Sequence, residues 1–187
     1  MLLAIPIGKE TTMEWQELLI DGYGRVLEVL EEALKGMTQD DLNQQPHPDC
    51  NSMGWLTWHL TRVQDDHIAD LMGEKQLWLS EGWHAKFNRP PHAKDIGWGH
   101  SSEDVAAFKS PDVATLLAYH RAVLERTKRY VSSLAAGDLD RELNEPWYQP
   151  LPTVGVRLIS VMADNLQHVG QIAYVRGLLK GKGWLAY

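Results

Sequence analysis

Four long segments with the apolar spacing of α-helices constrain the fold of this chain most strongly. Apolar side chains recur every three or four residues over about 11–35, from 51 or 52 to 72, over 110–136 and over 153–180. This period places them on one stripe of each helix, and the stripes must be buried against one another. No segment shows the convincing alternation of a strand. The sequence therefore predicts an all-α fold built as a four-helix bundle.

Local signals mark the ends of these helices. Thr11, followed by Glu14 three residues later, resembles a capping box, and Ser110 before Pro111 suits an N-cap followed by the first helical position. Thr153 is the candidate cap of the last helix, and residues 38–42 resemble a short capped turn. Glycine, which favours the left-handed conformation of a C-terminal cap, follows each helix, at Gly36, Gly73, Gly137 and Gly181.

The connection between the second and third helices, residues 74–109, has no clear period apart from a short predicted helix at Glu103 to Phe108. It carries three of the eight tryptophans, Trp78, Trp83 and Trp98. Such side chains need packing partners, which argues against disorder. Connections of this length without regular structure usually have a function. We therefore expect a long, ordered, Trp-rich cover.

Composition limits the possible partners and location. The net charge of −7, without a basic patch, argues against nucleic acid as the main partner. The single cysteine, Cys50, cannot form an intrachain disulfide, which fits a reducing compartment. The apolar start lacks the basic residues of a signal peptide, and no stretch reaches the roughly 18 apolar residues of a membrane span. We expect a single cytoplasmic domain over residues 1–187 that binds a small-molecule substrate.

An aspartate and a histidine stand out on the apolar stripe of the last helix. Asp164 and His168 are one turn apart, and a buried carboxylate must be paired, hydrogen-bonded or bound to a metal. His59, in the most apolar turn of the second helix, could meet this pair inside the bundle. Imidazole and carboxylate ligands suit Zn²⁺, Ni²⁺, Fe²⁺ or Mn²⁺. Three protein ligands would leave a position open for water or substrate.

Spacing alone leaves simpler interpretations open. His59 could be a hydrogen-bonded core residue, and Asp164 with His168 could be a side-chain pair within one helix. The tryptophans of the connection could serve packing only. Cys50, just before a helix, could have a lowered pKa, but an incidental role is simpler.

Several motifs in order resemble the DinB/YfiT-like superfamily. They are Gly-Trp-Leu-Thr-Trp-His-Leu at 54–60, Asp-Asn-Leu-Gln-His-Val-Gly-Gln-Ile at 164–172 and Arg-Gly-Leu-Leu at 176–179. Gly-Trp at 82–83, Gly-Trp-Gly-His-Ser at 97–101 and Arg-Leu-Ile-Ser-Val at 157–161 look most like its mycothiol-transferase-type branch. The resemblance covers most of the chain.

This resemblance implies an up-down-down-up bundle that holds a divalent metal through one histidine of the second helix and a His-x-x-x-His pair of the fourth. His59 and His168 match the first and last of these ligands, and Asp164 stands where the family often has a histidine. It further implies a thiol S-transferase that joins a low-molecular-weight thiol to a small electrophile through a metal-bound thiolate. The alternatives are a metal-dependent hydrolase and a non-catalytic, stress-related protein that binds a ligand.

The same interpretation assigns supporting residues. Trp83, Trp98 and Trp147 are expected to line the substrate pocket. One of Asn165, Gln167 and Gln171 is expected to orient a metal ligand, and spacing does not choose among them. Because bundles of this kind often dimerise, we also expect a homodimer.

Overall fold

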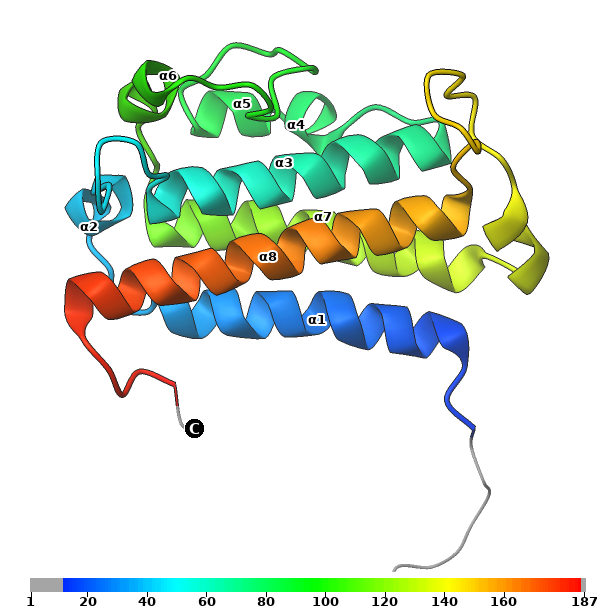
Figure 1. Cartoon of the computed structure of the whole chain (residues 1–187), viewed down its shortest axis with the longest axis horizontal. Coiled ribbons are helices and arrows are strands. Elements are labelled where there is room, and N and C mark those ends of the chain that lie inside the picture. The colour runs from blue at the N-terminus through cyan, green and yellow to red at the C-terminus, as the bar shows by residue number, and fades with distance from the viewer. Residues whose placement is uncertain (1–11, 186–187) are drawn as a thin grey trace, which may run out of the picture.

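Four long helices make up most of the computed structural model, which describes residues 12–185. They are α1 (Trp15–Leu34), α3 (Met53–Met72), α7 (Val113–Ser133) and α8 (Val154–Lys180). Each of α1 and α3 packs against both α7 and α8, so that the four helices lie side by side (Figure 1). Among the described residues, strand-like pairing is limited to one isolated bridge between Glu142 and Thr153. The prediction of an all-α fold is therefore confirmed.

Polar side chains determine where α3, α7 and α8 begin. Ser52 and Thr153 accept hydrogen bonds from backbone N–H groups of the first turn. Thr153 is the predicted cap, and Ser52 is one of the two positions predicted for the start of the second helix. The predicted cap of α7 was wrong. Asp112 accepts from the Thr115 N–H at 2.8 Å, because the Ser110 hydroxyl donates instead to the Pro111 carbonyl. α7 also ends earlier than predicted, at Ser133, and the 3₁₀ helix η1 (Ala136–Asp140) follows it.

α1 begins later than the sequence suggested. Thr11, the predicted cap, lies outside the described residues, and the N-cap position is taken by Glu14. The backbone N–H of Glu14 donates to the Glu17 carboxylate at 3.0 Å, which closes the first turn. Downstream of α1, the predicted capped turn is present as α2 (Gln39–Asn43), with Thr38 as its cap.

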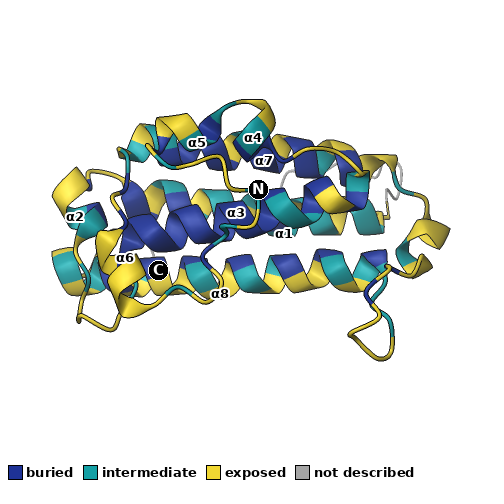
Figure 2. Ribbon diagram, turned by 90° about the horizontal axis from the view of Figure 1, so that it is seen from above, coloured by how far each residue is buried: buried dark blue, intermediate teal, exposed yellow. Residues whose placement is uncertain are grey.

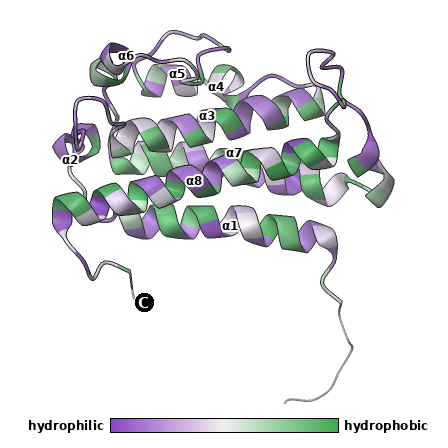
Figure 3. Ribbon diagram, viewed as in Figure 1, coloured by the Kyte–Doolittle hydropathy of each residue, from purple (hydrophilic) through white to green (hydrophobic). Residues whose placement is uncertain are grey.

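α3 is the most deeply buried helix, whereas α8 keeps an exposed outer face (Figure 2). Hydrophobic and hydrophilic residues alternate in patches along the long helices (Figure 3), as expected when one stripe of each faces a core. Fully buried residues of α3 nevertheless include the polar side chains of Arg62, Gln64 and Asp65. No helix within residues 12–185 is long and apolar enough to cross a lipid bilayer.

The connection over residues 74–109 is ordered and covers α3, as predicted. It contains three short helices, α4 (Leu77–Ser80), α5 (Trp83–Lys86) and α6 (Ser102–Ala107) (Figure 1). α6 lies close to the predicted short helix. The sequence analysis did not predict α4 and α5, because a helix of four residues is too short to show a period.

Buried polar side chains of α3 hold this connection in place. Asp65 accepts from the backbone N–H groups of Leu77 and Trp78 at 2.9 and 2.8 Å, and from the Tyr119 hydroxyl at 2.7 Å. Arg62 donates to the carbonyls of Ala93 at 2.8 Å and of Asp95 at 3.3 Å. These bonds satisfy charges that would otherwise be costly to bury, and they position the backbone that follows Asp95.

Candidate metal centre

His59 of α3 meets Asp164 and His168 of α8 between the two helices, where His59 is buried and the other two side chains are half-buried. Each offers one ligand atom, and the three atoms lie within 4.8 Å of one another. The two imidazole rings meet edge to face, with centroids 4.8 Å apart, and His168 Nε2 lies 3.4 Å from Asp164 Oδ1. The pair on α8 is separated by four residues, which places both side chains on the same face of the helix.

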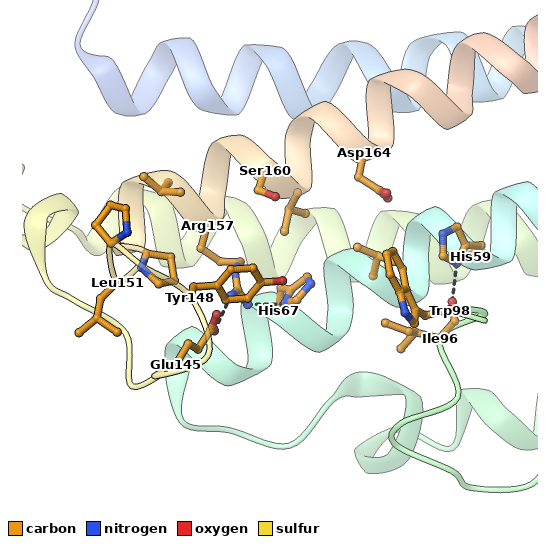
Figure 4. Close-up of a pocket in the computed structure, with 15 residues that line it drawn as sticks. His59, His67, Ile96, Trp98, Glu145, Tyr148, Leu151, Arg157, Ser160 and Asp164 are labelled. Atoms are coloured by element: carbon orange, nitrogen blue, oxygen red, sulfur yellow. Dashed lines mark hydrogen bonds and ion pairs between the residues drawn. The ribbon is translucent and has the colours of Figure 1, made fainter.

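The backbone of the Trp-rich connection orients the His59 ring. His59 Nδ1 lies 2.5 Å from the carbonyl oxygen of Ile96 (Figure 4). A carbonyl only accepts, so Nδ1 carries the proton and Nε2 keeps the lone pair that a metal needs. Burial, together with the nearby His168, lowers the pKa of His59, although the Ile96 carbonyl opposes this effect. The ring is therefore neutral at pH 7 and ready to act as a ligand.

A glycine makes this close approach of the backbone possible. Gly97 has a φ of 92°, in the left-handed region that favours glycine. A Cβ atom at this position would lie 2.7 Å from His59 Nδ1 and 2.8 Å from the Trp55 ring. Arg62 fixes the segment before Gly97, because it donates hydrogen bonds to the backbone carbonyls of Ala93 and Asp95. Arg62 and Gly97 together bring the Ile96 carbonyl onto His59.

Gln171 orients the second imidazole. His168 Nδ1 lies 2.8 Å from Gln171 Oε1, so the proton is on Nδ1 and Nε2 faces Asp164. Of the other two candidates, Asn165 is fully buried and donates to Gln64 at 2.6 Å, and Gln167 is exposed. Burial by itself lowers the pKa of His168. Hydrogen bonds to Asp164 and Gln171, together with the negative charge of Asp164, have the larger combined effect, so the pKa of His168 is raised.

The donor set fits a divalent cation. Asp164 Oδ2 is buried and has no hydrogen-bond partner among the described residues. An unpaired buried carboxylate oxygen is costly, and a cation would remove that cost. Donors bound to Zn²⁺ at about 2.0–2.2 Å lie about 3–4 Å apart, so the three side chains need only a small adjustment. Two imidazoles and a carboxylate suit a first-row divalent ion.

His59 and Asp164 lie at one end of an open cavity of about 630 Å³. Trp98, whose side chain is 88% exposed, lines this cavity beside His59 and Asp164 (Figure 4). The other two tryptophans expected there lie elsewhere. Trp83 is buried against Tyr119 with ring centroids 5.1 Å apart, and Trp147 is 73% exposed without lining the cavity. Trp83 packs inward because α5 turns it toward α7.

Comparisons with known proteins identify the family. The model of the DinB superfamily matches residues 23–172. The chain belongs to the DinB superfamily. A solved structure of a conserved protein from Enterococcus faecalis is 32% identical, covers 91% of this chain and 100% of its own, and superposes with a TM-score of 0.84. No curated protein matches the chain. DinB proteins are often metal-binding, whereas membership of the mycothiol-transferase branch stays a prediction.

Four residues that line the far end of the cavity had no role in the sequence-based prediction: Arg157, His67, Glu145 and Tyr148. One signal was available for Arg157. Residues 157, 161, 164 and 168 follow the helical spacing of three and four, so Arg157 shares the stripe of the predicted metal ligands. The Ile96 carbonyl gave no such signal, because every residue has one.

Proposed function

We propose that this DinB protein is a divalent-metal-dependent thiol S-transferase, in which a low-molecular-weight thiol attacks a small electrophile. The observation that carries the proposal is the meeting of His59, Asp164 and His168 beside an open cavity, which His59 and Asp164 line. A closed structural site would surround its ion with protein ligands. Three donors beside open space are typical of a catalytic site.

The charge of the donor set suits a thiol. Two neutral imidazoles and one carboxylate leave a divalent ion with a net positive charge. Such an ion lowers the pKa of a thiol that binds beside it and keeps it as the thiolate. The Ile96 carbonyl and Gln171 hold His59 and His168 with Nε2 free. Asp164 supplies the single negative charge.

The reaction is an S-alkylation or an S-addition. In both reactions the sulfur forms a bond to an electrophilic carbon. In the alkylation, the group displaced from that carbon leaves with the electron pair and takes up a proton. In the addition, the carbon or oxygen that receives the electron pair takes up the proton. The proton of the thiol leaves to solvent through the open side of the cavity. Val63, Ile96 and Trp98 supply an apolar wall against which the electrophile can pack. No side chain of the protein needs to act as the nucleophile.

Metal analysis of purified protein is the first test. We expect about one divalent ion per chain in the parent protein and its loss in His59→Ala and His168→Ala variants that stay folded. His47→Ala is the matched control, because His47 is exposed and is no part of the site. It should keep the ion.

Activity assays then separate the three functions. A transferase consumes thiol and electrophile together, and only in the metal-loaded protein. Turnover of an ester or amide without any thiol would instead support the metal-dependent hydrolase, in which the open position activates water. If the parent protein binds no metal even after incubation with Zn²⁺, Ni²⁺ or Mn²⁺, the non-catalytic ligand-binding role takes first place.

Four further features of the protein belong to this proposal. We infer one domain over residues 1–187, an up-down-down-up order of the long helices, a cytoplasmic location and a homodimer. The colour gradient of Figure 1 supports the helix order, because α1 and α8 run opposite to α3 and α7. The exposed, free Cys50 is compatible with a reducing compartment. Large apolar side chains on the outer face of α8, which include Ile159, Leu166, Tyr174 and Leu178, favour a second copy as partner.

A further inference from the structure

The cavity has a second polar end, distant from the metal donors. Arg157, His67, Glu145 and Tyr148 gather there (Figure 4). Arg157 precedes Asp164 by seven residues on α8, which corresponds to about 10 Å at 1.5 Å per residue. Apolar side chains, which include Val63, Ile96, Leu151 and Val161, make up much of the remaining wall of the cavity. A ligand that fills the cavity therefore meets metal donors at one end and a guanidinium at the other.

The far end is rich in hydrogen-bond donors. Arg157 Nη1 lies 2.7 Å from His67 Nδ1, and Arg157 Nη2 donates to Glu145. A guanidinium only donates, so His67 Nδ1 accepts, and the proton of the neutral ring is on Nε2. These two bonds leave other N–H groups of Arg157 available. The His67 Nε2–H and the hydroxyls of Tyr148 and Ser160 add further donors along the same wall.

One cation stands at this end of the cavity. Arg157 is the one lysine or arginine among the described residues that line the cavity, and Glu145 is its ion-pair partner. The side chain of Arg157 is only 13% exposed, so solvent screens it little. A planar guanidinium matches the two oxygens of a carboxylate. The nearby neutral donors suit the same kind of group.

We propose that Arg157, which lies about 10 Å along α8 from Asp164, marks a subsite for a carboxylate carried by the thiol substrate whose sulfur reaches His59, Asp164 and His168. The inference rests on the proposed thiol transferase function and narrows its substrate class to elongated thiol carboxylates. His67 and Tyr148 complete the donor set for the second carboxylate oxygen.

The opposing explanation is that Arg157 has a purely structural role. The ion pair of Arg157 with Glu145 joins the segment before α8 to the helix itself, and a tie of this kind needs no ligand. The two explanations predict opposite effects for one substitution. If Arg157 binds a ligand carboxylate, Glu145 competes with that ligand, and Glu145→Gln frees the guanidinium. If the pair is only a tie, Glu145→Gln and Arg157→Gln weaken ligand binding alike.

Thiol binding to the full-length Co²⁺-loaded protein tests the subsite without turnover. The thiolate-to-cobalt absorption band reports sulfur at the metal, and the probes are 8-mercaptooctanoate, 8-mercaptooctanol and 3-mercaptopropionate. We expect the long carboxylate to bind roughly tenfold to a hundredfold more tightly than the other two, as for a charge-assisted hydrogen bond. Arg157→Gln should abolish this preference while the cobalt content stays unchanged. Glu145→Gln should increase it.

The outcomes separate this inference from the proposed function. Equal affinities for the three thiols, or a parallel loss for all of them in both variants, would overturn the carboxylate subsite while leaving the metal-bound thiol intact. Absence of the band with every thiol would refute the thiol transferase itself. If the carboxylate that binds Arg157 belonged to the electrophile and not to the thiol, the three thiols would also bind with equal affinity. That result therefore counts against the inference.

Discussion

Replacement of Gly97 by alanine tests whether the backbone of the Trp-rich connection orients His59. The new Cβ would lie 2.7 Å from His59 Nδ1, 2.8 Å from the Trp55 ring and 3.1 Å from the Trp58 ring. The φ of 92° adds the strain of a left-handed residue, roughly 1–2 kcal/mol. The overpacking adds roughly 1–3 kcal/mol. We therefore expect Gly97→Ala to lower the free energy of unfolding by about 2–5 kcal/mol.

Relief of the overpacking should also weaken metal binding. If the segment moves away, the Ile96 carbonyl leaves His59 Nδ1, and the ring loses the bond that fixes its tautomer. Loss of such a supporting bond typically costs about 10-fold to 100-fold in metal affinity. Urea unfolding of the metal-free protein measures the first effect, and calorimetric titration with Zn²⁺ measures the second.

Gly99→Ala is the matched control for this experiment. Gly99 has a φ of 78°, but a Cβ there meets no atom within 4 Å. It should therefore show only the backbone strain, roughly 1–2 kcal/mol, with unchanged metal affinity. If the two variants lose the same stability and bind Zn²⁺ equally well, the contact between the connection and His59 does not have the role assigned to it.

Two further substitutions test the buried polar groups of the core. Burial, with the charge of Arg121, lowers the pKa of His120 from 6.5 to about 4, so the unfolded chain binds its proton more readily than the folded protein. Stability should then fall by about 3 kcal/mol as the pH drops from 6.5 to 4, and His120→Gln should flatten this dependence in urea unfolding at several pH values. Asp65→Asn leaves the buried guanidinium of Arg62 without its carboxylate partner, which lies 3.5 Å away, and leaves Arg126 with Glu74 as its one carboxylate partner among the described residues. Urea unfolding should show a loss of about 3–5 kcal/mol, whereas Glu31→Gln, at an exposed ion pair, should cost less than about 1 kcal/mol; equal losses would contradict the role given to burial.

Local spacing determined much of this protein. The caps at Ser52 and Thr153 act within one turn, so the sequence alone placed the start of α8 and narrowed the start of α3 to Asn51 or Ser52. It failed at Asp112, because the tertiary partners of Ser110 decide which of two neighbouring polar residues caps α7. The all-α fold followed from apolar periodicity, which is a property of consecutive residues.

The tertiary structure decided the details of the site. Asp164 and His168 share a face through their separation of four residues, so the sequence could pair them. Their meeting with His59, the approach of the Ile96 carbonyl and the inward turn of Trp83 depend on how the connection packs over α3. The grouping of Arg157 with His67 and Glu145 likewise joins residues from three parts of the chain. Contacts between distant segments are set by packing as a whole, and local sequence patterns carry little information about them.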